Sequence, residues 1–239
     1  MLELVTLPPA FGMRNISPFC LKAEMLLTAL ELPFKIREEA DPRKAPKGKL
    51  PFLVTDDGQI IADSELITEF LDAHTQGRVY EGLSAKDKAH GVALTRLAED
   101  HLYWMIVASR WLEDDWYPNV VEGFFHIAPK LVRPLVAGMA RREVARTYRL
   151  QGLGRHTKEE QQGFAHRDLQ ALNDAVPAEQ GFLFSDTPNV FDFTVAAMMA
   201  GLLDNQPATW ISELAAPYAN LREYTERVQA HVGVYGRNL

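Results

Sequence analysis

The sequence predicts an α/β domain at the N-terminus followed by an all-α domain. Three observations support this fold class. Residues 1–76 alternate between strand and helix patterns. Residues 77–84 form a short linker that contains Gly77 and Gly82. Residues 85–239 show helical patterns only. We therefore expect two domains, 1–76 and 85–239, joined by the linker 77–84.

The N-terminal elements are delimited by proline, glycine and capping residues. Ser17-Pro18 predicts a helix start, because serine is a favoured cap and proline suits the first helical position. Asp56-Asp57-Gly58 predicts a hairpin turn between two strands. The expected elements are strand 2–7, helix 18–30, strand 34–37, a polar loop over 41–49, strands 50–55 and 59–62, and helix 64–73.

The helical part begins with one long helix predicted from Ala85 to about Trp116. One of its faces is apolar and suits the core, whereas a second face is aromatic and charged. A helix with two such faces can border a core and a cleft at once. This second face carries Tyr103, Trp104, Arg110 and Trp111.

Later helices show recognisable start signals. Thr157 and Glu160 fit a capping box, and Asn189 with Asp192 repeats this pattern ahead of an apolar helix. A basic helical run covers 141–149, and a final helix is expected at about 220–230.

Composition excludes several classes of protein. The net charge of −7, from 25 basic and 32 acidic residues, argues against non-specific nucleic-acid binding and against an acidic membrane surface. The basic run 141–149 contains Glu143, so we interpret it as a solvated face. The apolar stretch 190–203 is too short to cross a bilayer. One cysteine and no basic leader suit a cytoplasmic protein.

Three short segments together predict one binding site. Each stands at the start of a helix or a strand and offers backbone groups or a hydroxyl to a ligand. The first is Ser17-Pro18-Phe19-Cys20. A hydroxyl among the free amides of a helix N-terminus can stabilise a thiolate, although a plain N-cap is the more common role of serine. Cys20 lies one turn into the helix, where it fits a small buried apolar side chain, and no C-x-x-C pair is present.

The other two segments offer backbone groups and a second hydroxyl. If the Leu50-Pro51 bond is cis, Leu50 presents its amide and its carbonyl to an extended peptide; an ordinary edge-strand proline is the alternative. Asp63 and Ser64 stand at a helix start that could hold the carboxylate and the ammonium of an amino acid; they could also be only a helix cap. A small, acidic, peptide-like thiol would satisfy all three segments.

Other kinds of site find no support in the sequence. The seven histidines show no metal-ligand spacing, Cys20 has no second thiol, and no glycine-rich phosphate loop or nucleophile elbow is present. We therefore expect no metal cofactor. The aromatic face with Tyr103, Trp104, Arg110 and Trp111 could line an apolar subsite, although aromatics at helical spacing often belong to a core.

Taken together, these segments resemble the glutathione S-transferase family over nearly the whole chain. The resemblance includes the thioredoxin-like order of 1–76, Leu50-Pro51, Asp63-Ser64 and the helical remainder. Asn189 to Asp192 is similar to the capping box of that family's helical domain. Ser17-Pro18-Phe19-Cys20-Leu21-Lys22, Arg110-Trp111 and the segment 152–156 resemble its Fax/metaxin-like branch.

The resemblance implies a glutathione site. Leu50 beside cis-Pro51 would pair with the cysteinyl backbone, Asp63 and Ser64 would hold the γ-glutamyl group, and Lys47 or Lys49 would meet the glycine carboxylate. A homodimer is the family expectation.

The resemblance also implies how the thiol is activated and used. Ser17 would donate a hydrogen bond to the sulfur, and the thiolate would attack an electrophile near Phe19, Tyr103, Trp104 and Trp111. The first tyrosine of the chain is Tyr80, so a tyrosine in the N-terminal domain cannot play this part. A backbone amide in place of the serine stays open, because the long loop 8–16 leaves the surroundings of the sulfur unspecified.

Two functions follow from this interpretation. The first is an enzyme that transfers glutathione to a small hydrophobic electrophile. The alternative is a non-catalytic binding or scaffolding protein of the Fax/metaxin type that keeps the same fold.

Overall fold

The computed structural model describes residues 1–126 and 128–238. Its sheet has four strands in the order β2-β1-β3-β4. β1 pairs in parallel with β2, whereas β3 is antiparallel to both β1 and β4. The strands are β1 (Leu2–Thr6), β2 (Phe34–Glu38), β3 (Phe52–Val54) and β4 (Ile60–Ala62).

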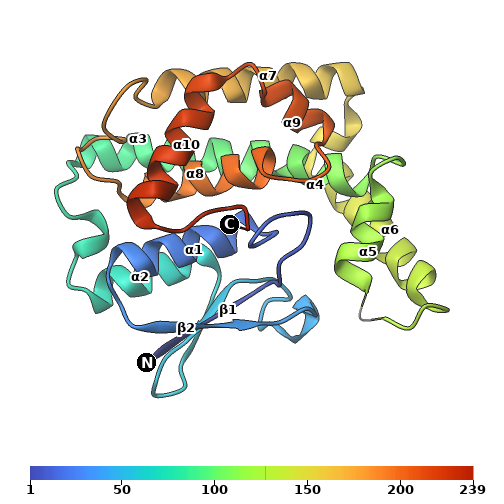
Figure 1. Ribbon diagram of the computed structural model, residues 1–239, viewed down its shortest axis with the longest axis horizontal. Helices are drawn as coiled ribbons and strands as arrows, with labels where there is room; N and C mark the ends of the chain where they lie inside the picture. The colour runs from blue at the N-terminus through green and yellow to red at the C-terminus, as the bar shows by residue number, and fades with distance from the viewer. Residues whose placement is uncertain (127, 239) are drawn as a thin grey trace.

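Two helices separate this sheet from the helical part of the molecule. α1 (Pro18–Ala29) and α2 (Ser64–His74) lie on one face of the sheet, and α3, α8 and α10 lie beyond them (Figure 1). The predicted α/β part with a thioredoxin-like order of elements, followed by an all-α part, is confirmed.

The predicted long helix differs from the observed one at its C-terminal end. α3 (Ala85–Arg96), a π-helical segment (Leu97–Leu102) and α4 (Tyr103–Trp111) follow one another without a break. The helix ends at Trp111 rather than near Trp116, because Trp116 is the N-cap of the separate helix α5 and the proline at the start of α5 favours a new helix.

The remaining helices include one that the sequence patterns missed. They are α5 (Tyr117–Phe125), α6 (Arg133–Gln151), α7 (Lys158–Ala175), α8 (Val190–Leu203), α9 (Trp210–Ala215) and α10 (Ala219–Val232). α9 escaped prediction because its six residues are too few to show a helical period. Both predicted capping boxes are present, at Thr157 ahead of α7 and at Asn189 ahead of α8.

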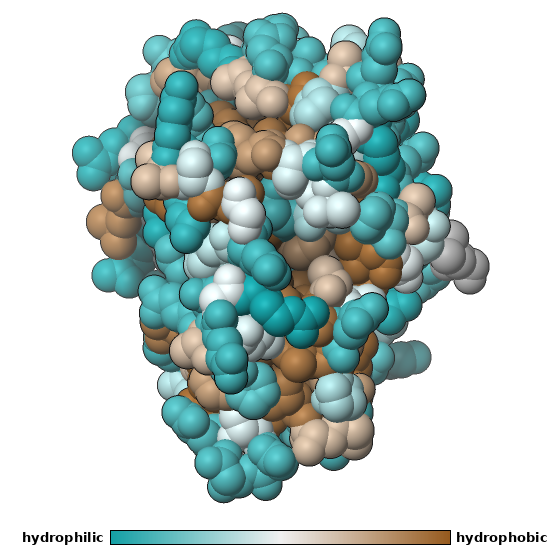
Figure 2. Space-filling view, turned by 90° about the vertical axis from the view of Figure 1, so that its left-hand side faces the viewer, coloured by the Kyte–Doolittle hydropathy of each residue, from teal (hydrophilic) through white to brown (hydrophobic). Residues whose placement is uncertain are grey.

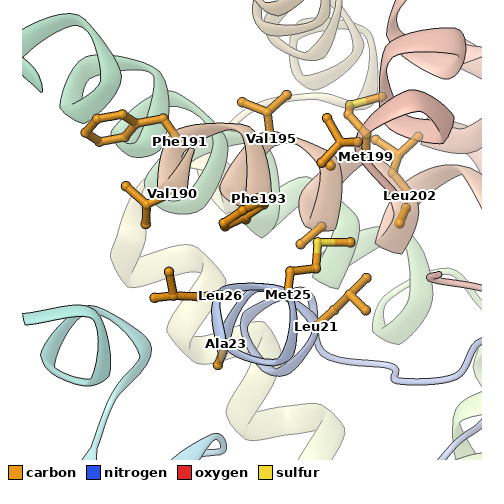
Figure 3. Packing of buried hydrophobic residues seen from close by; sticks show 14 of the residues in the cluster. Leu21, Ala23, Met25, Leu26, Val190, Phe191, Phe193, Val195, Met199 and Leu202 are labelled. Atoms are coloured by element: carbon orange, nitrogen blue, oxygen red, sulfur yellow. The ribbon is translucent and has the colours of Figure 1, made fainter. Parts of the chain in front are cut away.

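The core lies where α1 packs against the almost wholly buried helix α8 (Figure 3). Leu21, Met25 and Leu26 of α1 face Phe193 and Met199 of α8. Glycine at two positions of this core allows close approach. A Cβ on Gly201 would lie 2.9 Å from Cγ of Pro18, and one on Gly91 of α3 would lie 2.3 Å from the ring of Phe191.

A buried ion pair also connects α1 to the helical part. Lys22 Nζ lies 2.6 Å from Glu99 Oε1, and the two side chains are only 5% and 6% exposed. Glu99 belongs to the π-helical segment. Burial raises the pKa of Glu99, and Lys22 opposes that shift. The pair therefore offsets part of the cost of burying two charges at this contact.

The surface is mostly polar but exposes several large apolar side chains. Figure 2 faces the side of the molecule along which the linker between α2 and α3 runs, and it shows apolar surface among polar side chains. Ile60, Leu66 and Val92 are between 41% and 54% exposed. Among the described residues, no helix has the length and apolar character that a membrane span requires.

Candidate functional site

The three segments singled out in the sequence meet at one end of the strands of the sheet. Strand pairing places Val5 beside Phe52 and Phe52 beside Ala62, so the end of β1, the start of β3 and the end of β4 are neighbours. The amide of Asp63 donates to the carbonyl of Pro51 over 3.4 Å. Cys20, one turn into α1, belongs to the same small apolar cluster as Phe52 and Ala62. The N-termini of α1 and α2 therefore flank the start of β3.

Ser17 is the N-cap of α1, as predicted. Its backbone is extended, and its Oγ accepts a 3.4 Å hydrogen bond from the amide of Cys20. No acidic residue occupies the first turn of α1, so the positive end of the helix dipole is uncompensated. Oγ acts as an acceptor in that bond, so the hydroxyl proton can be donated to another group, and the Cys20 thiol is one neighbour within its reach.

Asn15 sets the geometry around Ser17. Its Oδ1 accepts a 3.0 Å bond from the Ser17 amide, and its Nδ2 donates to the Leu7 carbonyl over 3.1 Å. Asn15 is only 5% exposed. The side chain thus ties the end of β1 to the start of α1. The sequence places Asn15 near the site but does not reveal this role.

Cys20 is unsuited to thiol chemistry. It is fully buried, and burial raises the pKa of its thiol to about 12 even though the backbone of Leu7 and the side chain of Ser17 hydrogen-bond to it. A thiol with such a pKa is almost entirely protonated at neutral pH. The structure therefore supports the interpretation of Cys20 as a small apolar side chain.

Leu50 offers both of its backbone polar groups to a ligand. The Leu50–Pro51 peptide bond is cis. Within 1–126 and 128–238, neither the amide nor the carbonyl of Leu50 makes a backbone hydrogen bond. Buried backbone groups normally find partners, so an extended peptide that pairs with Leu50 would satisfy both.

Asp63 and Ser64 form the other side of the site. Asp63 has φ of 105°, and its Oδ1 caps α2 by accepting a 2.9 Å bond from the amide of Glu65. Strained backbone of this kind is common at ligand sites. Ser64 is 7% exposed, and no described residue is a partner for its hydroxyl. Lys47 and Lys49 are exposed on the loop before β3.

The predicted aromatic face divides into two groups. The rings of Phe19 and Tyr103 lie 4.8 Å apart edge to face, and Trp104 lies 6.0 Å from Tyr103. Trp111 instead packs against Phe124 of α5 at 5.3 Å. Phe19, next to the α1 cap, therefore links only the first group directly to the site. The Tyr103 hydroxyl has no hydrogen-bond partner within the described chain, and burial raises its pKa while the charge of Arg110 opposes the shift.

Arg110 is buried without a carboxylate partner among the described residues. Its guanidinium donates to the carbonyl of Ile16 over 3.1 Å and to the carbonyl of Gly201. Burial lowers the pKa of Arg110 to about 10. The side chain thus fastens the residue before Ser17 to α4 and α8.

The loop 8–16 is held by residues 236–237 near the end of the chain and by Gln206 after α8, which the sequence patterns did not predict. The amide of Arg14 donates to the carbonyl of Gly236 over 2.8 Å, and the amide of Gln206 donates to the carbonyl of Phe11 over 2.9 Å. Met13 and Arg237 also form an isolated antiparallel bridge. These contacts join residues more than 190 positions apart, so no local pattern could signal them.

A cavity of about 500 Å³ lies next to the site but on the other side of β1. Residues of β1, β2, α1 and the loop line it, whereas Ser17, Pro51 and Ser64 do not. It includes the ion pair of Arg14 with Glu24. Among the described residues, no group of three or more histidine, cysteine, aspartate or glutamate side chains is placed to hold a metal ion.

Comparison with known proteins places this geometry in context. Residues 18–116 match the glutathione S-transferase N-terminal domain. An isoprene-epoxide–glutathione S-transferase of Rhodococcus is 31% identical over 92% of this chain and 94% of its own. Failed axon connections of Drosophila melanogaster is 27% identical over 79% of this chain, and mouse metaxin-1 is 27% identical over 72%. The matches cover 47% and 56% of those two longer proteins.

Solved structures agree with the fold. A glutathione S-transferase of Methylobacterium radiotolerans, determined in complex with glutathione sulfonate, aligns with a TM-score of 0.60 at 15% identity. That alignment covers 100% of this chain and 97% of the other. Through its fold and its similarity to the Rhodococcus transferase over nearly its full length, this chain belongs to the glutathione S-transferase family, with further relatives in Failed axon connections and metaxin-1.

Proposed function

We propose that the protein transfers glutathione to a small hydrophobic electrophile. The observation that carries this proposal is the unpaired backbone of Leu50 between two helix N-termini, each with a hydroxyl. The cysteinyl residue of glutathione pairs with Leu50 beside Pro51. Its γ-glutamyl carboxylate lies at the start of α2 with Ser64, and its ammonium group meets Asp63. Lys49, or Lys47, meets the glycine carboxylate at longer range.

Ser17 activates the thiol in this proposal. Its hydroxyl proton is available, and the first turn of α1 carries no acid to oppose a negative charge. A hydrogen bond and the helix dipole both stabilise a thiolate and lower the pKa of the bound thiol. The thiolate then forms a carbon–sulfur bond with the electrophile. Neither step requires a metal ion.

The electrophile lies against the aromatic group of Phe19, Tyr103 and Trp104, with Trp111 and Arg110 farther along the same helix. We propose an epoxide as the substrate class, because the Rhodococcus relative is named for one. When the thiolate attacks a ring carbon of an epoxide, a carbon–oxygen bond breaks, and the ring oxygen gains negative charge and takes up, through solvent, a proton equivalent to the one that the thiol released. The free hydroxyl of Tyr103 is suited to donate a hydrogen bond to that oxygen.

We also propose a division into two domains, a cellular location and an oligomeric state for this protein. Residues 1–76 form the glutathione-binding unit, and residues 85–239 form the unit that holds the electrophile. Residues 77–84 are the linker between them. A cytoplasmic location suits a single buried thiol. A homodimer would cover exposed apolar side chains such as Ile60, Leu66 and Val92.

The test measures conjugation of glutathione to a small alkyl epoxide by mass spectrometry. Ser17→Ala should lower kcat by roughly 100-fold, the usual effect of removing one hydrogen-bond donor to a developing anion. The ultraviolet absorbance of the bound thiolate should titrate at higher pH in this variant. Unchanged turnover and an unchanged thiol titration would remove Ser17 from the mechanism.

A second function has a specific observation in its favour. Failed axon connections and metaxin-1 are similar to most of this chain and are not named as enzymes. The alternative is therefore a non-catalytic binding or scaffolding protein. In that case glutathione at millimolar concentration would not bind, and no epoxide would be consumed.

A further inference from the structure

The N-terminal part of α6 exposes a concentration of large apolar side chains. Leu131, which precedes the helix, is 97% exposed, Leu135 is 64% exposed and Met139 is 59% exposed. Val132 and Val136, on the adjoining ridge, are 44% and 37% exposed. In Figure 1, α5 and α6 project from the body of the molecule at the side opposite the linker between α2 and α3. These five residues, called here the α6 apolar patch, form an exposed tip.

The same face of α6 becomes basic toward its C-terminus. Leu135 and Met139 are followed at steps of three and four residues by Arg142, Arg146 and Arg149, so these five lie on one stripe of the helix, and Leu131 lies in the turn just before it. Arg142 and Arg149 are exposed, and within the described chain neither has a salt-bridge partner. Arg146 pairs only with Glu143, at 3.2 Å, and its side chain is 69% exposed.

This charge is segregated from the rest of the molecule. Residues 130–151 contain six basic residues and one acidic residue, in a chain whose net charge is −7. The net charge and Glu143, taken alone, favour a solvated face without a membrane partner. The apolar patch that continues the basic stripe changes this expectation.

We propose that this face of α6 docks on an anionic lipid surface. Apolar side chains beside arginine and lysine are the features by which surface helices bind acidic membranes. Arg142 lies seven residues beyond Leu135, which corresponds to about 10 Å along a helix. If the tip enters the acyl boundary, Arg142 lies near the depth of the phosphates, and Arg146 and Arg149 lie farther out, where the negative surface potential still attracts them.

The arrangement suits lipid better than a second copy of this chain. A two-fold interface must be self-complementary, and a stripe whose charges are nearly all positive is not. The patch also lies on a projecting tip, where a fluid bilayer can adapt to shape and a rigid partner cannot. Lipid phosphates supply the negative charge that the stripe lacks.

The test is co-sedimentation of the purified full-length protein with vesicles. One set contains only phosphatidylcholine, and the other contains roughly a third phosphatidylglycerol, at low and at physiological salt. We expect binding to the anionic vesicles that weakens with salt. Leu131→Ser/Leu135→Ser/Met139→Ser and, separately, Arg142→Gln/Arg146→Gln/Arg149→Gln should each weaken binding at least about tenfold.

Matched controls distinguish binding through this surface from non-specific binding through other exposed apolar side chains, and from effects on the glutathione site. Ile36→Ser removes an exposed apolar side chain elsewhere, on β2, and should bind vesicles as the parent does. All variants change exposed residues, so each should keep the parent's unfolding midpoint and glutathione affinity. Failure to sediment with either vesicle, or sedimentation that neither triple substitution weakens, would overturn the proposal. So would dimerisation through the patch without vesicle binding.

Discussion

The buried pair of Lys22 and Glu99 supplies the sharpest prediction about stability. Replacing Lys22 by methionine leaves the Glu99 carboxylate with little water and no cation at hydrogen-bond distance. At 2.6 Å and an effective dielectric constant of about 20, the lost Coulomb attraction is about 6 kcal/mol. Solvent and protein relaxation return part of this, so we expect a loss of about 3–5 kcal/mol in the free energy of unfolding.

The assay is urea unfolding followed by circular dichroism, with Lys22→Met, Glu99→Leu and the double variant compared. The double variant leaves no buried charge at this contact, and exchange of a buried pair for apolar side chains is often neutral. It should therefore recover most of the stability that Lys22→Met loses. If Lys22→Met costs less than about 1 kcal/mol, or if the double variant is as unstable as the single one, the pair is not the buried link described here.

Two further predictions concern stability. Asp168 raises the pKa of His101, so this contact stabilises the fold fully below the ordinary histidine pKa of about 6.5 and loses its effect as pH rises through the raised value. The unfolding midpoint should fall as pH rises above about 6.5, and His101→Gln should remove that slope; an unaltered slope would refute the assignment. Gly201→Ala would press a Cβ against Pro18 and should cost about 1–3 kcal/mol, whereas Gly138→Ala meets no atom within 4 Å and should stabilise by about 0.5–1 kcal/mol. Similar urea midpoints for the two alanine variants would contradict this close approach.

Most of the correctly predicted elements were recognised from local sequence signals such as helix caps and turns. Ser17-Pro18, the Asp56-Asp57-Gly58 turn and the capping boxes at Thr157 and Asn189 act within a few residues. The helix end near Trp111 was missed because the aromatic pattern continues into α5 while the backbone turns. The π-helical segment likewise leaves no clear trace in the sequence.

The residues that form the candidate site could be predicted from the sequence, whereas the tertiary contacts that hold them in place could not. Ser17, Leu50 and Ser64 could be recognised because each stands at the start of an element. The contacts of Arg110 with Ile16 and Gly201, and of the chain end with the loop 8–16, depend on tertiary packing. Lys22 did carry a signal, since a lysine within an almost wholly buried helix needs a partner, but its partner lies 77 residues away.

The central claim is that Leu50, Ser64 and the α1 cap form a glutathione site, and calorimetric titration with reduced glutathione tests it most directly. The account predicts saturable binding that Ser64→Ala weakens by about tenfold or more, the usual effect of losing a hydrogen bond to a charged group. Ser84→Ala, which removes a helix cap outside the site, should leave the affinity unchanged. Absence of binding at millimolar glutathione, or equal affinity in the Ser64→Ala protein, would contradict the account.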